Sequence, residues 1–103
     1  MAAMNKYPYE QRVKTYLEAI HTFGEENQEE VAIEEMAEHT KEICKYWRGR
    51  DNCAAIAEEI ADVTIMLEQL RIIYGVNDAV RDFMDAKIER LHMRIQEHLY
   101  RAQ

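Results

Sequence analysis

Apolar residues recur every three or four positions through four segments of the chain, which is the period of an amphipathic helix. The first segment runs from about Tyr9 to Phe23, and the second from just after Gly24 to about Trp47. The third follows the break "RGRDN", and the fourth starts near Asn77. The three glycines fall between these segments, and no strand pattern or repeat competes with them. The pattern therefore predicts an all-α protein of four helices.

Each predicted helix carries one apolar stripe that we expect to face inward. The stripes are Val13, Tyr16, Leu17, Ile20 and Phe23; Ile33, Ala37, Thr40, Cys44 and Trp47; Ile56, Ile60, Val63, Leu67, Leu70 and Tyr74; and Val80, Met84, Ile88, Leu91, Ile95 and Leu99. Gly24 is expected to end the first helix in the left-handed conformation. Asp51 or Asn52 is expected to cap the third helix, and Asn77 the fourth.

The third helix is apolar on more than one side, because Ile65, Ile72 and Ile73 lie off its main stripe. Such a helix needs more cover than three partners from its own chain supply. We therefore predict a four-helix bundle that is completed by homodimerisation, or by a dimer of dimers. With 103 residues, the whole chain, 1–103, is expected to form a single domain.

Charge and composition exclude several functions. The net charge of −7 argues against a nucleic-acid binder or a protein of anionic membranes, and it fits a protein that gathers divalent cations. The chain contains no serine, which rules out a serine nucleophile.

Neither a signal peptide nor a membrane span is expected. The start "MAAMNKYPYEQR" has no apolar stretch, and no later run reaches 18 consecutive apolar residues. Cys44 and Cys53 lack the C-x-x-C spacing of zinc ligands, and we expect both to be reduced thiols. These features together predict a cytoplasmic protein.

Two short acidic frames of the same shape occur on the second and third predicted helices. "EEMAE" contains Glu35 and Glu38, and "EEIAD" contains Glu59 and Asp62. Residues three apart share a helix face, so a hairpin of the two helices would bring the four carboxylates together. Because four carboxylates repel one another, we expect a cation among them, and hard oxygen ligands favour Mg²⁺ or Mn²⁺.

Spacing alone is weak evidence in so acidic a chain. A third frame, "EENQE" at 25–29, has the same shape but lies at a helix start, where acids favour the dipole. Glu59 and Asp62 lie in the most apolar helix, which favours the metal-ligand interpretation for this pair. For Glu35 and Glu38 a solvated helix face explains the spacing at least as well.

The two frames together resemble the signature of the MazG-like all-α nucleoside triphosphate pyrophosphohydrolases. That signature is E-E-x-x-E, about 20 residues, then E-x-x-D; "DVTIMLEQLRIIYG" and "KIERLHMR" resemble the same family. The resemblance covers roughly residues 10–95. It implies Mg²⁺-dependent hydrolysis of a nucleoside triphosphate, NTP or dNTP, to the monophosphate and pyrophosphate, as in nucleotide-pool housecleaning. It also implies four metal ligands, which are Glu35, Glu38, Glu59 and Asp62. Two further acids, Glu34 and Glu58, are implied as candidates for the general base or for contacts just outside the ligands.

Hydrolysis at the α-phosphorus also needs cationic groups for the leaving pyrophosphate. A basic stripe on the fourth helix supplies them: Lys87, Arg90 and Arg94. The family commonly carries Lys and Arg in this region for phosphate contacts. Some members have Asn two residues before that Lys, where this chain has Asp85. Ordinary surface pairing of the stripe with Asp82 and Glu89 explains it equally well.

Trp47, within "KYWRGRDN", offers a stacking platform for a base, and Arg48 or Arg50 offers a phosphate partner. Trp47 is also in phase with the apolar stripe of its helix. Core packing is therefore the favoured interpretation for this residue.

Two rival functions remain open. "EAIH" at 18–21 and "ERLH" at 89–92 have the Glu-x-x-His spacing of di-iron bundles, although their acids lie off the apolar stripes. The other rival is a non-catalytic helical oligomerisation or interaction module, in which both acidic frames are solvated faces. A scaffold should gain little stability from Mg²⁺, whereas a ligand that binds only the folded state must stabilise it.

Overall fold

The computed structural model describes residues 6–103 and contains four helices in this range, as predicted, with no strand. The helices are α1 (Tyr9–Phe23), α2 (Glu25–Trp47), α3 (Cys53–Ile73) and α4 (Asn77–Arg101). None of them combines the length and the apolar character that crossing a bilayer requires. Residues 1–5, the beginning of the segment in which no signal peptide is expected, lie outside the described part.

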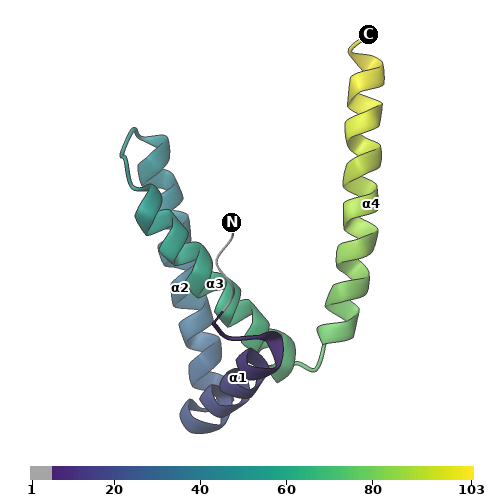
Figure 1. The fold of residues 1–103 in the computed structure, drawn as a ribbon. Helices are drawn as coiled ribbons and strands as arrows, with labels where there is room; N and C mark the ends of the chain where they lie inside the picture. Colours follow the sequence, from purple (N-terminus) through teal and green to yellow (C-terminus); the bar gives the residue numbers. More distant parts are fainter. Residues whose placement is uncertain (1–5) are drawn as a thin grey trace.

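Helices α2 and α3 form an antiparallel hairpin, and α1 packs against both at the end away from the 48–52 turn (Figure 1). Asn52 immediately precedes α3, but its side chain makes no capping hydrogen bond to that helix. Instead its Nδ2 donates to the backbone oxygen of Glu42, at 2.9 Å, and to its Oε2, at 2.6 Å. The predicted cap residue therefore closes the hairpin across the turn.

Gly24 separates α1 from α2 with φ of 92° and ψ of 148°. The positive φ was expected, but this ψ lies outside the left-handed helical region. Glycine adopts such a conformation without steric cost, so the chain turns sharply between the two helices.

Four side chains make the buried centre of the hairpin, and two of them are polar. Ala32 and Met66 are 1% and 6% exposed, and Gln28 and Gln69 are 6% and 4% exposed. The two amides satisfy each other, because Gln28 Nε2 donates to Gln69 Oε1 at 2.6 Å. Gln69 Nε2 in turn lies 3.7 Å from Met66 Sδ. A paired amide removes most of the cost of burying a polar group.

The apolar stripes do not all face inward, which corrects the prediction for α2. All five of its stripe residues are exposed, Ile33 to 65% and Trp47 to 89%. The opposite face of α2 meets α3, because small Ala32 lets the two helices approach and the glutamines pair there. On α3, likewise, Ile60, Leu67 and Tyr74 stay exposed. Hydrophobic period thus identified the helices correctly but not the face that this chain covers.

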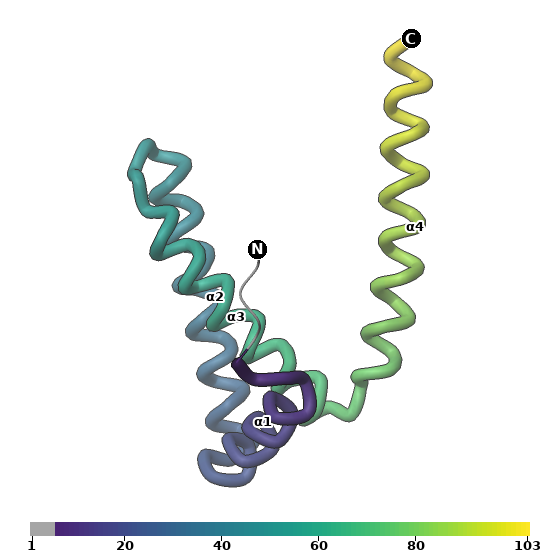
Figure 2. Tube along the Cα trace, in the orientation of Figure 1, coloured from purple at the N-terminus to yellow at the C-terminus, as the bar shows by residue number. Residues whose placement is uncertain are grey.

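Helix α4 stands apart from the other three and contacts only α3, near its own start (Figure 2). Every residue of the chain from Arg81 onward is exposed. The radius of gyration is 17.4 Å, compared with about 13 Å for a compact domain of this length. One copy of the chain therefore does not close the predicted four-helix bundle.

Candidate carboxylate site between α2 and α3

Three of the four predicted metal ligands meet between α2 and α3. Glu35 comes from α2, and Glu59 and Asp62 come from α3. One carboxylate oxygen from each lies within 4.8 Å of the other two, and all three side chains are half-buried. The hairpin produces this arrangement because antiparallel packing aligns the middle of α2 with the first half of α3.

The pKa of Glu35 is raised above its ordinary value of 4.5. Partial burial is the largest cause, followed by the charges of Asp62 and Glu59, a side-chain hydrogen bond with Glu59 and the charge of Glu38. The cluster therefore opposes ionisation of its own member from α2. A positive group at this position would relieve that opposition.

Glu59 Oε2, within the cluster, and His39 Nδ1, on the same helix as Glu35, are buried and have no hydrogen-bond partner among the described residues. His39 lies one turn after Glu35 on α2, and so faces the same side of that helix. Buried polar atoms normally have a hydrogen-bond partner, so both atoms are candidates for contact with a bound group. The sequence interpretation missed His39, although its i, i+4 spacing from Glu35 is a readable signal.

Glu38, the fourth predicted ligand, is exposed and does not belong to the close group. Its charge still reaches the cluster, since it contributes to the raised pKa of Glu35. Glu34 and Glu58 directly precede members of the cluster, and both are exposed. The structure thus separates three converging acids from three at the periphery.

The predicted substrate-contacting residues lie elsewhere. Lys87, Arg90 and Arg94 are exposed on α4, which contacts neither α1 nor α2. Within residues 6–103 none of the three forms an ion pair, so the alternative pairing with Asp82 and Glu89 is absent there. Trp47 lies twelve residues after Glu35, about 18 Å along α2, and its exposure contradicts the core-packing interpretation.

The structure gives the third acidic frame a structural role and argues against a di-iron centre. In the third frame, Glu29 Oε2 accepts a hydrogen bond from the Tyr74 hydroxyl at 2.7 Å, which ties the start of α2 to the end of α3. This contact also raises the pKa of Tyr74. The two Glu-x-x-His pairs lie exposed on α1 and α4, which do not contact each other, so one copy of the chain cannot form a di-iron centre from them.

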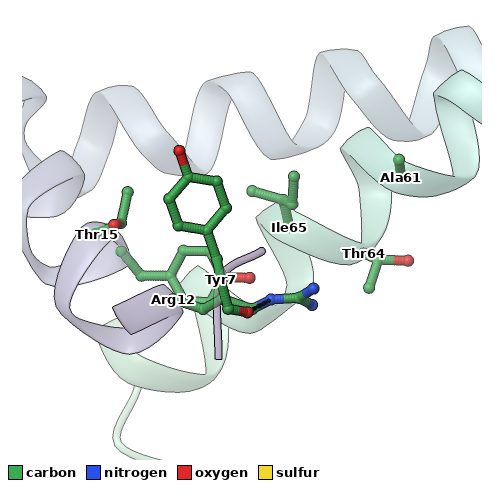
Figure 3. A pocket seen from close by; sticks show the side chains of 7 residues that line it. Tyr7, Arg12, Thr15, Ala61, Thr64 and Ile65 are labelled. Atoms are coloured by element: carbon green, nitrogen blue, oxygen red, sulfur yellow. Dashed lines mark hydrogen bonds between the residues drawn. The ribbon is translucent and has the colours of Figure 1, made fainter. Parts of the chain in front are cut away.

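A pocket of about 570 Å³ lies between the start of α1 and the middle of α3 (Figure 3). It is lined by Tyr7, Arg12, Thr15, Tyr16, Ala61, Thr64 and Ile65. Ala61 and Ile65 lie within one helical turn of Asp62 along α3. Arg12 Nε donates to the Tyr7 backbone oxygen at 2.9 Å, which fixes Arg12 at the pocket. The sequence interpretation missed this pocket, because it joins segments about 50 residues apart.

No protein-family model, no curated protein and no solved structure matches this chain. The resemblance to the MazG-like family therefore stays a prediction from the spacing of its acids. What the structure adds is the convergence of three of those four acids on one point.

Proposed function

We propose that this chain is a metal-dependent nucleoside triphosphate pyrophosphohydrolase that acts in nucleotide-pool housecleaning. The observation that carries the proposal is the convergence of Glu35, Glu59 and Asp62 from two helices. The charges of Asp62 and Glu59 oppose the ionisation of Glu35, and a cation bound among the three carboxylates would relieve this repulsion.

The residues of the cluster fit a divalent cation. All three donors are carboxylate oxygens, the ligands that Mg²⁺ and Mn²⁺ prefer, and Glu59 Oε2 has no other partner. In this proposal Glu38, which is exposed and lies outside the close group, is the fourth ligand. A bound Mg²⁺ would polarise the phosphate oxygens of the substrate and lower the pKa of a water molecule beside it.

The chain's own residues supply the remaining steps. An oxygen–phosphorus bond forms between water and the α-phosphorus, the α–β phosphoanhydride bond breaks, and pyrophosphate leaves. Glu34 or Glu58, exposed beside the cluster, accepts the proton of the attacking water. Lys87, Arg90 and Arg94, which lie away from the cluster of their own chain, come from a second copy in this proposal and neutralise the departing pyrophosphate.

The pocket between α1 and α3 is the better position for the nucleoside. Its volume lies within the usual range for small-molecule sites, and Tyr7 and Tyr16 offer rings for stacking a base. Trp47 offers the same chemistry, but about 18 Å from Glu35 along α2. In a single copy of the chain, a base stacked on Trp47 would therefore lie far from the carboxylates.

Pyrophosphate release from a panel of NTPs and dNTPs, with Mg²⁺, with Mn²⁺ and with EDTA, tests this proposal. We expect metal-dependent release together with the nucleoside monophosphate. Glu59→Gln and Asp62→Asn should each lower the rate at least 100-fold with helix content unchanged, while Glu26→Gln, in the third frame, should keep it. Full activity in Glu59→Gln, or no turnover by folded wild type across the panel, would contradict the proposal.

One observation favours a second candidate, a non-catalytic helical oligomerisation module. The exposed apolar stripes of α2, α3 and α4 are what such a module presents to other chains. The same stripes support a homodimer, or a dimer of dimers, for the enzyme. Mg²⁺ separates the two functions, because only a protein that binds the ion in its folded state unfolds at a higher temperature when the ion is added.

A further inference from the structure

The pocket between α1 and α3 contains one cationic side chain, Arg12, among the seven described residues that line it. Four of the others are aromatic or aliphatic: Tyr7, Tyr16, Ala61 and Ile65. None of the seven is acidic, so Arg12 meets no carboxylate within this lining. A flat group with hydrogen-bond acceptors suits such surroundings better than a phosphate, whose charge is costly to remove from water.

Arg12 is fixed in the pocket through one edge of its guanidinium. Its Nε donates to the Tyr7 backbone oxygen at 2.9 Å, and Figure 3 shows the guanidinium pointing toward Thr64. This bond uses one of the five N–H groups and leaves the four on Nη1 and Nη2. Within residues 6–103 neither of these two nitrogens takes part in an ion pair or a further hydrogen bond. Arg12 therefore presents a planar fork of donors to a ligand in the pocket.

The two threonines of the pocket can only accept hydrogen bonds from a ligand. Thr64 Oγ1 donates to the backbone oxygen of Ile60 at 2.7 Å, and Thr15 Oγ1 donates to that of Gln11 at 3.0 Å. A hydroxyl has one proton, so each threonine still offers its lone pairs alone. The pocket thus combines paired donors from Arg12 with a separate acceptor at Thr64.

This combination divides the nucleobases into two groups. Guanine offers two neighbouring acceptors, O6 and N7, with the N1–H donor beside them. Cytosine likewise offers O2 and N3, with its amino group beside them. Adenine instead has its amino donor next to N7 and N1, and uracil and thymine have the N3–H donor between their carbonyls. Because an arginine has donors but no acceptor, it pairs fully with the first two bases only.

We propose that Arg12 is the specificity-determining residue of this pocket and selects nucleotides whose base presents two neighbouring acceptors, guanine or cytosine, over adenine, uracil and thymine. The rings of Tyr7 and Tyr16 stack on the base, and Thr64 accepts from the donor beside the acceptor pair. Placing a nucleoside here rests on the proposed function. The selection itself needs no metal ion, because Arg12 contacts the base and not the phosphates.

Calorimetric titration of the full chain with GMP, CMP, AMP and UMP in EDTA tests the selection without turnover. We expect GMP or CMP to bind about 5- to 150-fold more tightly than AMP and UMP, which is the discrimination that one bidentate pair provides. Arg12→Lys should abolish this preference with helix content unchanged, because lysine keeps the charge but lacks the fork. The control, Lys14→Ala, removes an exposed cation of α1 outside the pocket and should keep the preference.

Three results of this titration overturn the inference. They are equal or absent binding of the four nucleotides, tighter binding of AMP or UMP, and a preference that survives in Arg12→Lys. If the charge of Arg12 only held a phosphate, lysine would replace it and the base would not matter.

A change in the ligand tests the same contact in the unaltered protein. If GMP is preferred, 7-deaza-GMP, in which a C–H replaces N7, should bind as weakly as AMP. If CMP is preferred, UMP is the matched ligand, because N3 is an acceptor in cytosine and carries a proton in uracil. Binding of 7-deaza-GMP as tight as that of a preferred GMP overturns the role of Arg12.

The selection and the proposed function can fail separately. Pyrophosphate release from all NTPs at similar rates, unchanged in Arg12→Lys, would overturn the selection and leave the pyrophosphohydrolase standing. An Arg12-dependent preference for GMP or CMP, in a protein that releases no pyrophosphate, would support the selection and refute the proposed function.

Discussion

Glu35 is the residue whose surroundings most oppose its normal charge. Partial burial reduces the stabilisation of its charge by solvent. The negative charges of Asp62 and Glu59 on α3, and of Glu38 on α2, add to this effect. The folded chain therefore binds a proton at Glu35 more tightly than the unfolded chain does. The contribution of Glu35 to folding stability must then fall as the pH rises above the ordinary value of 4.5.

In EDTA, Glu35→Gln should make the protein more stable than wild type at pH 7, because a neutral amide removes the repulsion. The difference should vanish below pH 4, where the carboxyl is protonated in both folded and unfolded chains. Added Mg²⁺ should reverse the order at pH 7 if the cluster binds it. Thermal unfolding of both proteins at the two pH values measures this. A variant that is less stable than wild type in EDTA at pH 7 would contradict the electrostatic account.

At the scale of residues, three of the four acids that the sequence analysis expected to converge do lie together, and helix pairing is what decides this. Glu35, Glu59 and Asp62 meet because α2 and α3 form the predicted hairpin. Glu38 is exposed although its spacing is the same as that of Asp62 from Glu59. Spacing along the sequence shows which residues share a face of one helix. It does not show which face turns toward the neighbouring helix, because that depends on tertiary packing.

At the scale of elements, the hairpin is organised around a buried pair of amides rather than around the apolar stripes. Gln28 and Gln69 are almost fully buried and hydrogen-bonded to each other at 2.6 Å. If one amide is lost, the other is left buried without its partner, which costs about 1–3 kcal/mol. The pair therefore fixes which faces of α2 and α3 meet.

We expect Gln69→Leu to lower the free energy of unfolding by about 1–3 kcal/mol, and Gln28→Leu with Gln69→Leu to recover much of that loss. The double variant replaces both partners by apolar groups, so no amide remains unpaired. Urea denaturation followed by circular dichroism measures both changes. If the single variant is as stable as wild type, the amide pair does not hold the hairpin together.

Helix number and helix ends were readable from the sequence, because glycines and hydrophobic period are local signals. The covered face of α2 was not. Its apolar stripe is more hydrophobic than the face with Gln28 and Ala32, so hydrophobicity alone assigned the wrong side. An apolar stripe that no helix of the same chain covers is expected where a helix packs against another chain.

At the scale of the whole molecule, apolar stripes that are covered by another chain make stability depend on protein concentration. If the stripes are covered only in a dimer, unfolding separates two chains, and the midpoint of thermal unfolding must rise with protein concentration. Each tenfold increase adds about 1.4 kcal/mol per mole of dimer in favour of the folded state. Calorimetry across a hundredfold concentration range should therefore show a steady rise for wild type. Ile88→Asp with Leu91→Asp should unfold at a lower temperature that is independent of concentration, because a single copy has no partner to lose. A constant midpoint in wild type would mean that the open shape of one chain is stable alone, and that its apolar faces await a different partner.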